Sequence, residues 1–295
     1  MLKNEFPGKI ETEEGISISF CTNFAHDKLD QSKPLVVFNY GLICNNKHWR
    51  EQIPYFDQHG YSILYHDYRG HFESSEMDSL EELTFEKIAL DIEVLTKHLK
   101  AKKLVMIGHS MGVNVCLEYA RSHSENLEAL ILISGSAVPP QGVMFDNNTM
   151  DIIQPYLEWI SKKFPKVIAP VWKNSYKNPI ARKIIHRGGF NTQMVPDEFI
   201  QIYMKKIGEL SPEIFFQLIN QMRNQDILHH LENITTPTLI IGGDKDKVIP
   251  NYLQEILLKY LKNSEEYIVK NGSHVPQVDF PETINERIQI FLSKL

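Results

Sequence analysis

The sequence predicts an α/β fold in which a parallel sheet carries helices on both faces. Three observations favour this class. Short apolar runs typical of buried strands alternate with longer stretches that have the amphipathic spacing of helices. The connections between them are short, and the same alternation returns near the end of the chain after a middle segment of different character. Because parallel neighbours need a crossover connection, usually a helix, this rhythm is typical of a sheet covered on both sides.

The first half of the chain supplies most of the expected elements. Strands are expected at residues 16–24, 35–38, 62–65, 104–107 and 127–133. Helices are expected at residues 46–58, 84–99 and 111–122. The 84–99 segment is the clearest helix, because apolar side chains recur there every three or four positions. Thr84 begins it as an imperfect capping box, with Lys87 in place of the usual glutamate.

The middle of the chain differs from both ends. Residues 139–232 contain no convincing strand, and prolines such as Pro155 and Pro170 divide them into helical pieces. The alternation then resumes, with strands expected at residues 238–241 and 266–269 and helices at 251–261 and 281–293. We therefore predict one core made of residues 1–138 and 233–295, with residues 139–232 inserted into it as a helical cap.

Composition limits the partners and the compartment. A formal net charge of −6 argues against nucleic acid, because phosphate binding needs an excess of Lys and Arg. No apolar run approaches the roughly 20 residues that span a bilayer, and the N-terminus lacks the apolar region of a secretory signal, so a cytoplasmic protein is expected. The three cysteines, Cys21, Cys44 and Cys116, have no paired spacing, which favours reduced, packed thiols over a disulfide framework or a metal site.

One pentapeptide carries the strongest chemical signal. Gly108-His109-Ser110-Met111-Gly112 lies between an expected buried strand and an expected helix. A G-x-S-x-G sequence is common by chance, but in this context it predicts a nucleophile elbow. The glycines are needed because the serine sits on a strained turn where neighbouring side chains would clash. The turn lifts the Ser110 hydroxyl above the sheet edge.

A serine hydroxyl needs a base, and the base needs an acid. Among twelve histidines, His274 follows the last expected strand, so it lies at the same edge of the sheet as Ser110. His109 adjoins Ser110 but is expected to point away from it. After the strand at 238–241 come Asp244 and Asp246, and we predict Asp246 as the acid because it immediately precedes the segment leading into the next helix. The chain order Ser, Asp, His fits an elbow of this type.

Two backbone amides are candidates for an oxyanion hole. The Met111 amide lies at a helix N-terminus directly after the nucleophile. The second donor is expected in the loop after the 35–38 strand, where Gly41 permits a sharp turn and the amide of Leu42 can face Ser110. Cys44 lies in the same loop.

These motifs resemble those of the α/β-hydrolase-fold enzymes, of the esterase, lipase and carbon–carbon hydrolase type, over nearly all of the chain. The residues that carry the resemblance are Tyr40-Gly41 through Trp49, residues 66–71, the 108–112 elbow, Asp246 with Val248-Ile249-Pro250, and Gly272-Ser273-His274. The resemblance implies a mostly parallel eight-stranded sheet, a helical cap after the sixth strand, a Ser110–His274–Asp246 triad, and the Leu42 and Met111 amides as oxyanion hole. The family's usual His-Gly pair after the third strand is Tyr40-Gly41 here.

The identity of the nucleophile limits the classes of reaction that are expected. Family members that displace at carbon use aspartate at the elbow, whereas Ser110 suits acyl transfer to water through an acyl-enzyme, with no cofactor or metal. The prediction is a serine hydrolase acting on a carboxylic ester or related acyl compound. The alternatives that use the same triad are an acyltransferase or perhydrolase and a carbon–carbon bond hydrolase. A non-catalytic binding protein on this fold is a further alternative.

The predicted cap is expected to set the substrate class, a small acyl or lipid-like molecule. Candidate pocket residues are Tyr40, Cys44, His109, Trp159 and Val248. Residues 150–172 are rich in large apolar side chains, which either pack the cap and line its pocket or form a lipid-facing helix that contacts a membrane peripherally. Residues 139–195 carry eight basic against three acidic residues, a net +5, which either attracts anionic groups or is a solvated face. The sequence does not define the oligomeric state.

Overall fold

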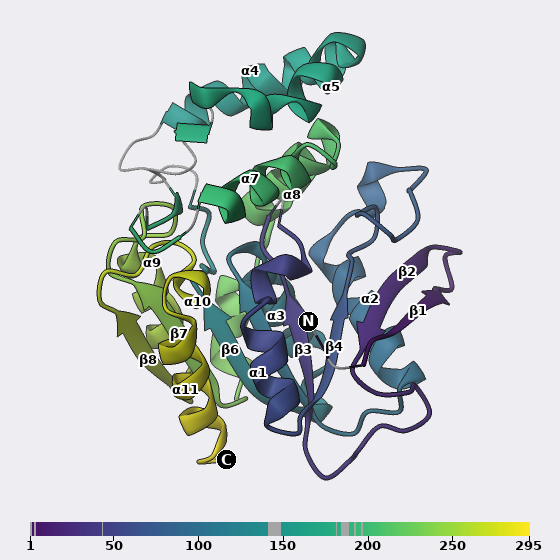
Figure 1. Cartoon of the computed structure of the whole chain (residues 1–295), viewed down its shortest axis with the longest axis vertical. Helices are drawn as coiled ribbons and strands as arrows, with labels where there is room; N and C mark the ends of the chain where they lie inside the picture. Colours follow the sequence, from purple (N-terminus) through teal and green to yellow (C-terminus); the bar gives the residue numbers. More distant parts are fainter. Residues whose placement is uncertain are drawn as a thin grey trace.

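The computed structural model describes residues 2, 4–42, 44–140, 149–180, 182–183, 189–191, 193–195 and 197–295. Its strands are Phe6–Glu11 (β1), Ser17–Thr22 (β2), Leu35–Asn39 (β3), Ser62–His66 (β4), Leu104–His109 (β5), Leu127–Ile133 (β6), Thr238–Gly243 (β7) and Ser264–Val269 (β8). They form one sheet in the order β1-β2-β4-β3-β5-β6-β7-β8 (Figure 1). β2 pairs antiparallel with β1 and β4, and all other neighbours are parallel. The predicted mostly parallel eight-stranded sheet is confirmed.

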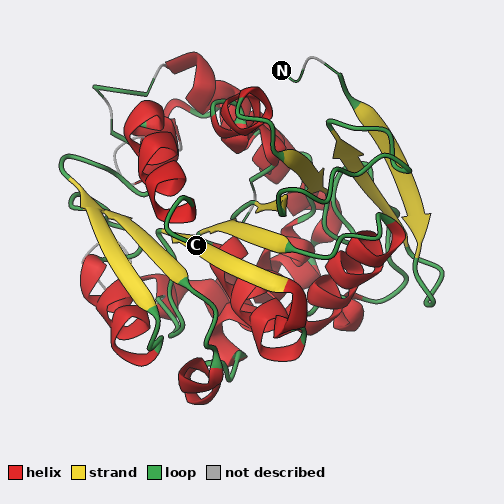
Figure 2. Cartoon of the chain, turned by 90° about the horizontal axis from the view of Figure 1, so that it is seen from below, coloured by secondary structure: helices red, strands yellow, loops and turns green. Residues whose placement is uncertain are grey.

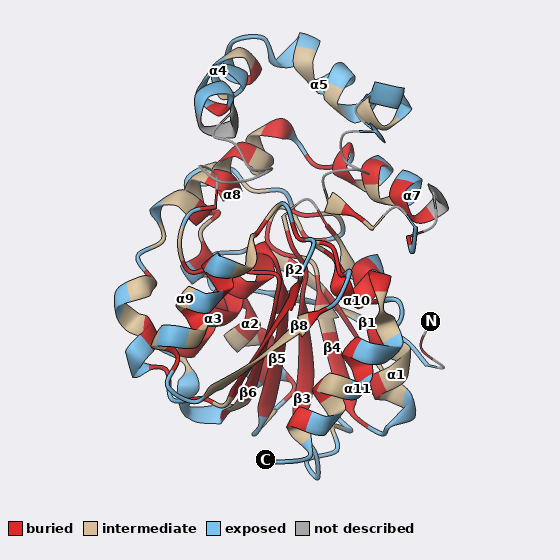
Figure 3. Ribbon diagram, turned by 90° about the vertical axis from the view of Figure 1, so that its left-hand side faces the viewer, coloured by how far each residue is buried: buried red, intermediate tan, exposed pale blue. Residues whose placement is uncertain are grey.

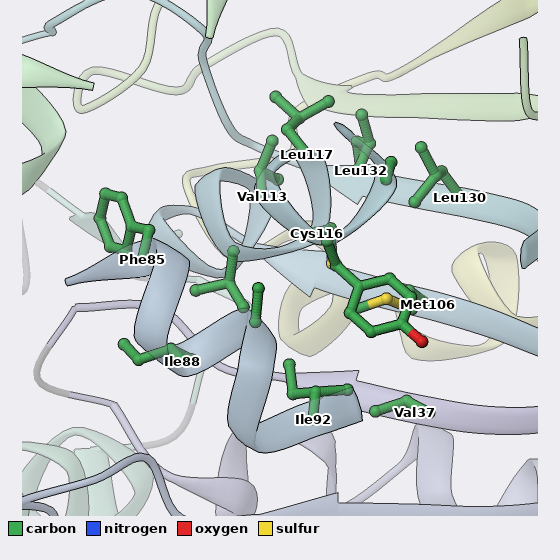
Figure 4. Packing of buried hydrophobic residues seen from close by; sticks show 14 of the residues in the cluster. Val37, Phe85, Ile88, Ile92, Met106, Val113, Cys116, Leu117, Leu130 and Leu132 are labelled. Atoms are coloured by element: carbon green, nitrogen blue, oxygen red, sulfur yellow. The ribbon is translucent and has the colours of Figure 1, made fainter. Parts of the chain in front are cut away.

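Helices cover both faces of this sheet (Figure 2). They are Gln52–Gln58 (α1), Phe85–His98 (α2), Met111–Ser122 (α3), Asn251–Tyr260 (α9), Pro276–Asp279 (α10) and Pro281–Leu292 (α11). Alternate residues of each strand point to opposite faces, so Val37 and Met106 pack with α2 and α3 (Figure 4), whereas Val36 and Val105 pack with α1 and α11. Strands buried on both faces explain the continuous apolar runs in the sequence, and Figure 3 shows β3 to β6 mostly buried.

Two expectations about the N-terminal part need correction. The first strand, β1, was not expected, because Pro7 and Gly8 interrupt its pattern and it lies at the exposed edge of the sheet, where a proline is tolerated. The single helix expected at 46–58 is a short 3₁₀ helix, Asn46–Trp49, followed by α1. Pro54 has no N–H to donate to the carbonyl of Arg50 and its ring would clash there, so a continuous helix through this segment is disfavoured.

Helical segments connect β6 to β7 in the described part of the chain, and the longest of them are four α-helices. They are Thr149–Lys163 (α4), Pro165–Lys173 (α5), Asp197–Ile207 (α7) and Pro212–Asn224 (α8). α8 packs on the sheet's own helical layer through Leu218 and Met222. α7 packs through Phe199 on Val275 and Val278, which follow β8, and α4 and α5 lie farthest from the sheet (Figure 1). None of the described helices has the length and apolarity that crossing a membrane requires. The limits 139 and 232 of the expected cap remain a prediction.

Candidate active site

The sharp turn between β5 and α3 positions Ser110. Its backbone has φ 54° and ψ −119°, a conformation that residues other than glycine rarely adopt. The amide of Ser110 donates to the carbonyl of Ile133 at 2.9 Å, which ties the turn to β6. A Cβ at Gly108 would lie 2.7 Å from the sulfur of Cys116, and one at Gly112 would overlap the carbonyl of Asn39. The two glycines are therefore required by the close approach of α3 to the strands.

Three side chains that are distant in sequence meet at this turn. The Nε2 atom of His274 lies 3.0 Å from the Oγ atom of Ser110. The Nδ1 atom of the same ring lies 3.0 Å from Oδ2 of Asp246. The three residues follow β5, β7 and β8, so the carboxyl ends of three parallel strands bring them together. A carboxylate can only accept, so Nδ1 carries a proton and Nε2 is left free to accept the Ser110 hydroxyl proton.

The loop after β7 holds Asp246 firmly. Its Oδ1 atom accepts the amides of Val248 and Ile249, each at 2.8 Å, and its side chain is fully buried. These two donors occupy one carboxylate oxygen and leave the other for His274. Asp244, by contrast, is exposed and lies 3.9 Å from the ammonium group of Lys245. Asp246, and not Asp244, faces the histidine.

Two further residues hold the His274 loop. The Nε2 atom of His109 lies 2.8 Å from the backbone carbonyl of His274, so this nitrogen carries the proton and donates. Burial, with His274 and His48 nearby, holds the pKa of His109 well below its ordinary value, so the ring is neutral. Oδ2 of Asp279 accepts the amide of Ser273 at 2.6 Å. Neither contact is predictable from the sequence: the bond from His109 joins two loops that are distant in sequence, and nothing distinguishes Asp279 from a surface acid.

The loop after β3 lies against the nucleophile. A Cβ at Gly41 would lie 3.0 Å from the Cβ of Ser110, so a side chain at this position would crowd the nucleophile unless its neighbours shifted. Tyr40, which stands where the family usually has histidine, is fully buried and anchors the loop. Its hydroxyl accepts the amide of Tyr68 at 3.1 Å, and the Tyr68 hydroxyl donates to the carbonyl of Tyr40 at 2.8 Å. The tyrosine pair thus supplies the anchor, while the Leu42 and Met111 amides remain predicted donors.

Cys44 of this loop belongs to a cluster of residues of metal-ligating types. The donor atoms of Cys44, His48 and His109 lie within 4.8 Å of one another, the only such group of three found among the described residues. Burial lowers the pKa of His48 to about 3 and raises that of Cys44 to about 12, so in this environment the imidazole is neutral and the thiol protonated. If the Cys44 thiol lost its proton on binding, the thiolate and the two imidazoles could hold an ion such as Zn²⁺. Acyl transfer by Ser110 requires no such ion.

The remaining pocket candidates occupy different positions. Val248 supports Asp246 through its amide. Trp159 lies on α4 and is 53% exposed.

A small hollow lined by His48, Phe199 and Tyr203 separates the loop after β3 from α7. Ser110 itself is only 8% exposed, and Figure 1 shows α7 and α8 next to one end of the sheet.

Comparisons with known proteins agree with this architecture. The profile of a family described as the alpha/beta hydrolase fold matches residues 34–281. The protein ABHD8 of Homo sapiens is 26% identical over 273 residues, which cover 89% of this chain and 56% of that protein, so the chain spans little more than half of that relative. The bifunctional esterase/perhydrolase DCH of Acinetobacter calcoaceticus is 24% identical over 296 residues, covering 97% of this chain and 99% of that protein.

The likeness extends to solved structures. The esterase EaEST from Exiguobacterium antarcticum superposes with a TM-score of 0.77 over 98% of this chain and 100% of that chain, at 22% sequence identity. At this identity the superposition establishes the shared fold, and the chemistry has to be argued from the residues of this chain.

Proposed function

The chain belongs to the alpha/beta hydrolase fold family, and on this premise we propose that it is a serine hydrolase that cleaves a carboxylic ester or a related acyl compound. The observation that carries the proposal is the continuous hydrogen-bonded chain from Ser110 through His274 to Asp246, with both links at 3.0 Å. Each atom in it has the proton-accepting or proton-donating role that nucleophilic catalysis by serine needs.

In the first half of the proposed cycle, the Ser110 oxygen attacks the substrate carbonyl carbon while Nε2 of His274 takes the hydroxyl proton. The tetrahedral intermediate carries a negative oxygen, which the amides of Met111 and Leu42 would stabilise. The bond from carbon to the leaving oxygen then breaks, and His274 returns the proton to that oxygen. The alcohol leaves, and the acyl group remains bonded to Ser110.

In the second half, His274 takes a proton from water, whose oxygen attacks the acyl carbon. The bond to Ser110 breaks, and the serine oxygen recovers the proton, which releases the acid. Asp246 stabilises the imidazolium form of His274 in both halves. The positive φ of Ser110 supports its role as nucleophile, because the turn holds the hydroxyl at the end of β5 with His274 beside it.

A labelling experiment with a matched control tests the proposal. Ser134 follows β6, is fully buried and also has a positive φ, but its hydroxyl has no hydrogen-bond partner among the described residues. We expect a fluorophosphonate probe to label the wild type and Ser134→Ala but not Ser110→Ala. Ester turnover should fall by a factor of about 10⁴ or more in Ser110→Ala alone. Labelling or near-normal turnover of folded Ser110→Ala would refute the assignment of the nucleophile.

A perhydrolase activity is the second candidate. The relative whose name includes this activity matches over nearly the full length of both chains. In that reaction hydrogen peroxide replaces water in attacking the acyl-enzyme, which yields a peracid. Product analysis with an ester and increasing peroxide distinguishes the two: peracid that increases with peroxide supports the perhydrolase, and carboxylic acid alone supports the hydrolase.

A further inference from the structure

In the outermost helix, α4, the usual arrangement of an amphipathic surface helix is reversed. Its inward face is polar: Gln154 is 2% exposed and Ser161 1% exposed. The side-chain amide of Gln154 donates to Asn220 of α8 at 3.2 Å and accepts from Arg223 of α8 at 3.2 Å. Glu158, on the same face, accepts from Asn220 at 3.3 Å. Polar groups therefore hold α4 to the rest of the protein.

The outward face of α4 is apolar. Ile152, Tyr156 and Trp159 recur at helical spacing and are 60%, 67% and 53% exposed. Ile153 and Leu157 widen this stripe and are also exposed. A helix on a water-facing surface normally shows the reverse pattern, with its apolar stripe against the core. The exposed apolar face therefore indicates a contact with something other than water.

The neighbouring helix α5 extends the same surface. Phe164, Val167 and Val171 are 48%, 63% and 66% exposed. Trp172 is turned inward instead, where its indole nitrogen donates to the carbonyls of Ile207 and Leu210 at 3.2 and 2.9 Å. The outward residues of α4 and α5 make up half of the exposed large hydrophobic residues in the described part of the chain. Figure 3 shows both helices at the end of the molecule farthest from the sheet, with most of their surface exposed.

Lysines surround this apolar surface. Lys162, Lys163, Lys166 and Lys173 lie within or between the two helices, and the only acid from 152 to 173 is Glu158, which is bonded to Asn220 and Lys162. The ammonium group of Lys163 lies 4.6 Å from the ring centre of Trp159 and 5.7 Å from that of Phe164. Asp146 and Arg187, which entered the +5 count, lie outside the described residues.

We propose that the outer face of α4 and α5 binds an anionic membrane surface. Aromatic and aliphatic side chains that interleave with lysines suit the boundary between headgroups and acyl chains, where anionic headgroups attract the lysines. A second copy of the chain fits less well, because a two-fold contact would place these lysines against their own equivalents. Trp159, Tyr156 and Val167 enter the interface, and the polar seam between α4 and α8 anchors the surface to the fold.

Binding of the full chain to vesicles tests the proposed membrane contact. The assay needs no catalytic turnover, so its outcome is independent of whether the proposed hydrolase activity is found. Vesicles of phosphatidylcholine alone are compared with vesicles containing about one third phosphatidylserine, by co-sedimentation. The double variant Tyr156→Ser/Trp159→Ser should bind anionic vesicles at least about tenfold more weakly. The matched control is Tyr252→Ser/Ile290→Ser, which removes one aromatic and one aliphatic side chain of similar exposure from α9 and α11 and should bind as the wild type does.

Two further experiments test the contribution of the lysines and the insertion of Trp159 into the membrane. Lys166→Glu/Lys173→Glu should lose at least about fivefold for each lysine, and raised salt should weaken wild-type binding. Tryptophan emission should shift to the blue with anionic vesicles, and Trp159→Phe should remove the shift while binding persists. Equal binding by the apolar double variant and its control would overturn the proposal. Equal binding of the wild type to both vesicle types would also overturn it. Self-association in solution that the same substitutions abolish would instead assign the surface to a second copy of the chain.

Discussion

Asp246→Asn is the most informative single substitution in the proposed triad. The amides of Val248 and Ile249 both donate to Oδ1 at 2.8 Å, so in the variant the side-chain oxygen must occupy this position. The amide nitrogen then takes the place of Oδ2 and presents its hydrogens to Nδ1 of His274. That nitrogen can no longer donate and must accept, so the proton of the neutral ring moves to Nε2. An Nε2 that already carries a proton cannot take one from Ser110.

The expected cost follows from the wrong tautomer. The same exchange in a serine protease lowers kcat by about 10⁴ with the geometry intact, which corresponds to about 5 kcal/mol of barrier. We expect a loss of this order in kcat/KM for a short aryl ester, with an unchanged thermal midpoint. Asp244→Asn is the control, because its exposed carboxylate is 3.9 Å from Lys245 and contributes little. Turnover by Asp246→Asn within tenfold of the wild type would refute the reasoning.

Three other expectations concern stability. Gly112→Ala should lower the thermal midpoint sharply, because its Cβ would overlap the backbone of β3. Gly189→Ala, whose Cβ would meet no atom of the described residues within 4 Å, should not, and equal midpoints would contradict this expectation. Arg69→Met should lower the free energy of unfolding in urea by about 3–5 kcal/mol, because it leaves the buried carboxylate of Asp91 without its ion-pair partner. In the wild type the guanidinium of Arg69 lies 2.7 Å from Oδ1 of Asp91. A loss below about 1 kcal/mol would contradict this expectation. Burial raises the pKa of Asp67 to about 6, so the folded state binds its proton more tightly than the unfolded state does, and the contribution of Asp67 to stability falls as pH rises from about 4 to 6. Asp67→Asn removes this contribution, so the stability of the variant relative to the wild type should rise over this pH range, and an unchanged difference would contradict the prediction.

The sequence predicts those features whose cause is local. The 108–112 segment is recognisable because strand, glycines and helix are adjacent, and the structure confirms a strand up to His109 and a helix from Met111. Thr84 does cap α2, accepting the amide of Lys87 at 3.2 Å. In both cases the residues that determine the structure lie within a few positions of one another.

Features that depend on tertiary contacts were not predictable. The bond from His109 to the carbonyl of His274 joins residues on two different loops, and no periodicity encodes it. The apolar residues of α4 were visible in the sequence, but which face the protein buries depends on Asn220 and Arg223, which come from another helix. An amphipathic pattern gives the two faces of a helix and leaves open which one turns inward.

The position of the helical segment between β6 and β7 has a consequence for how the molecule is made. On the ribosome, the strained serine turn emerges with β5 and α3, long before the residues that follow β7 and β8. β6 pairs with β7 across the whole intervening segment, with Leu130 opposite Thr238, so this pairing is a non-local contact that can form only after β7 has been made. A nascent or truncated chain that ends before β7 therefore carries the hydroxyl without its base. The proposed triad is complete only when the last fifth of the polypeptide, from β7 onward, has docked.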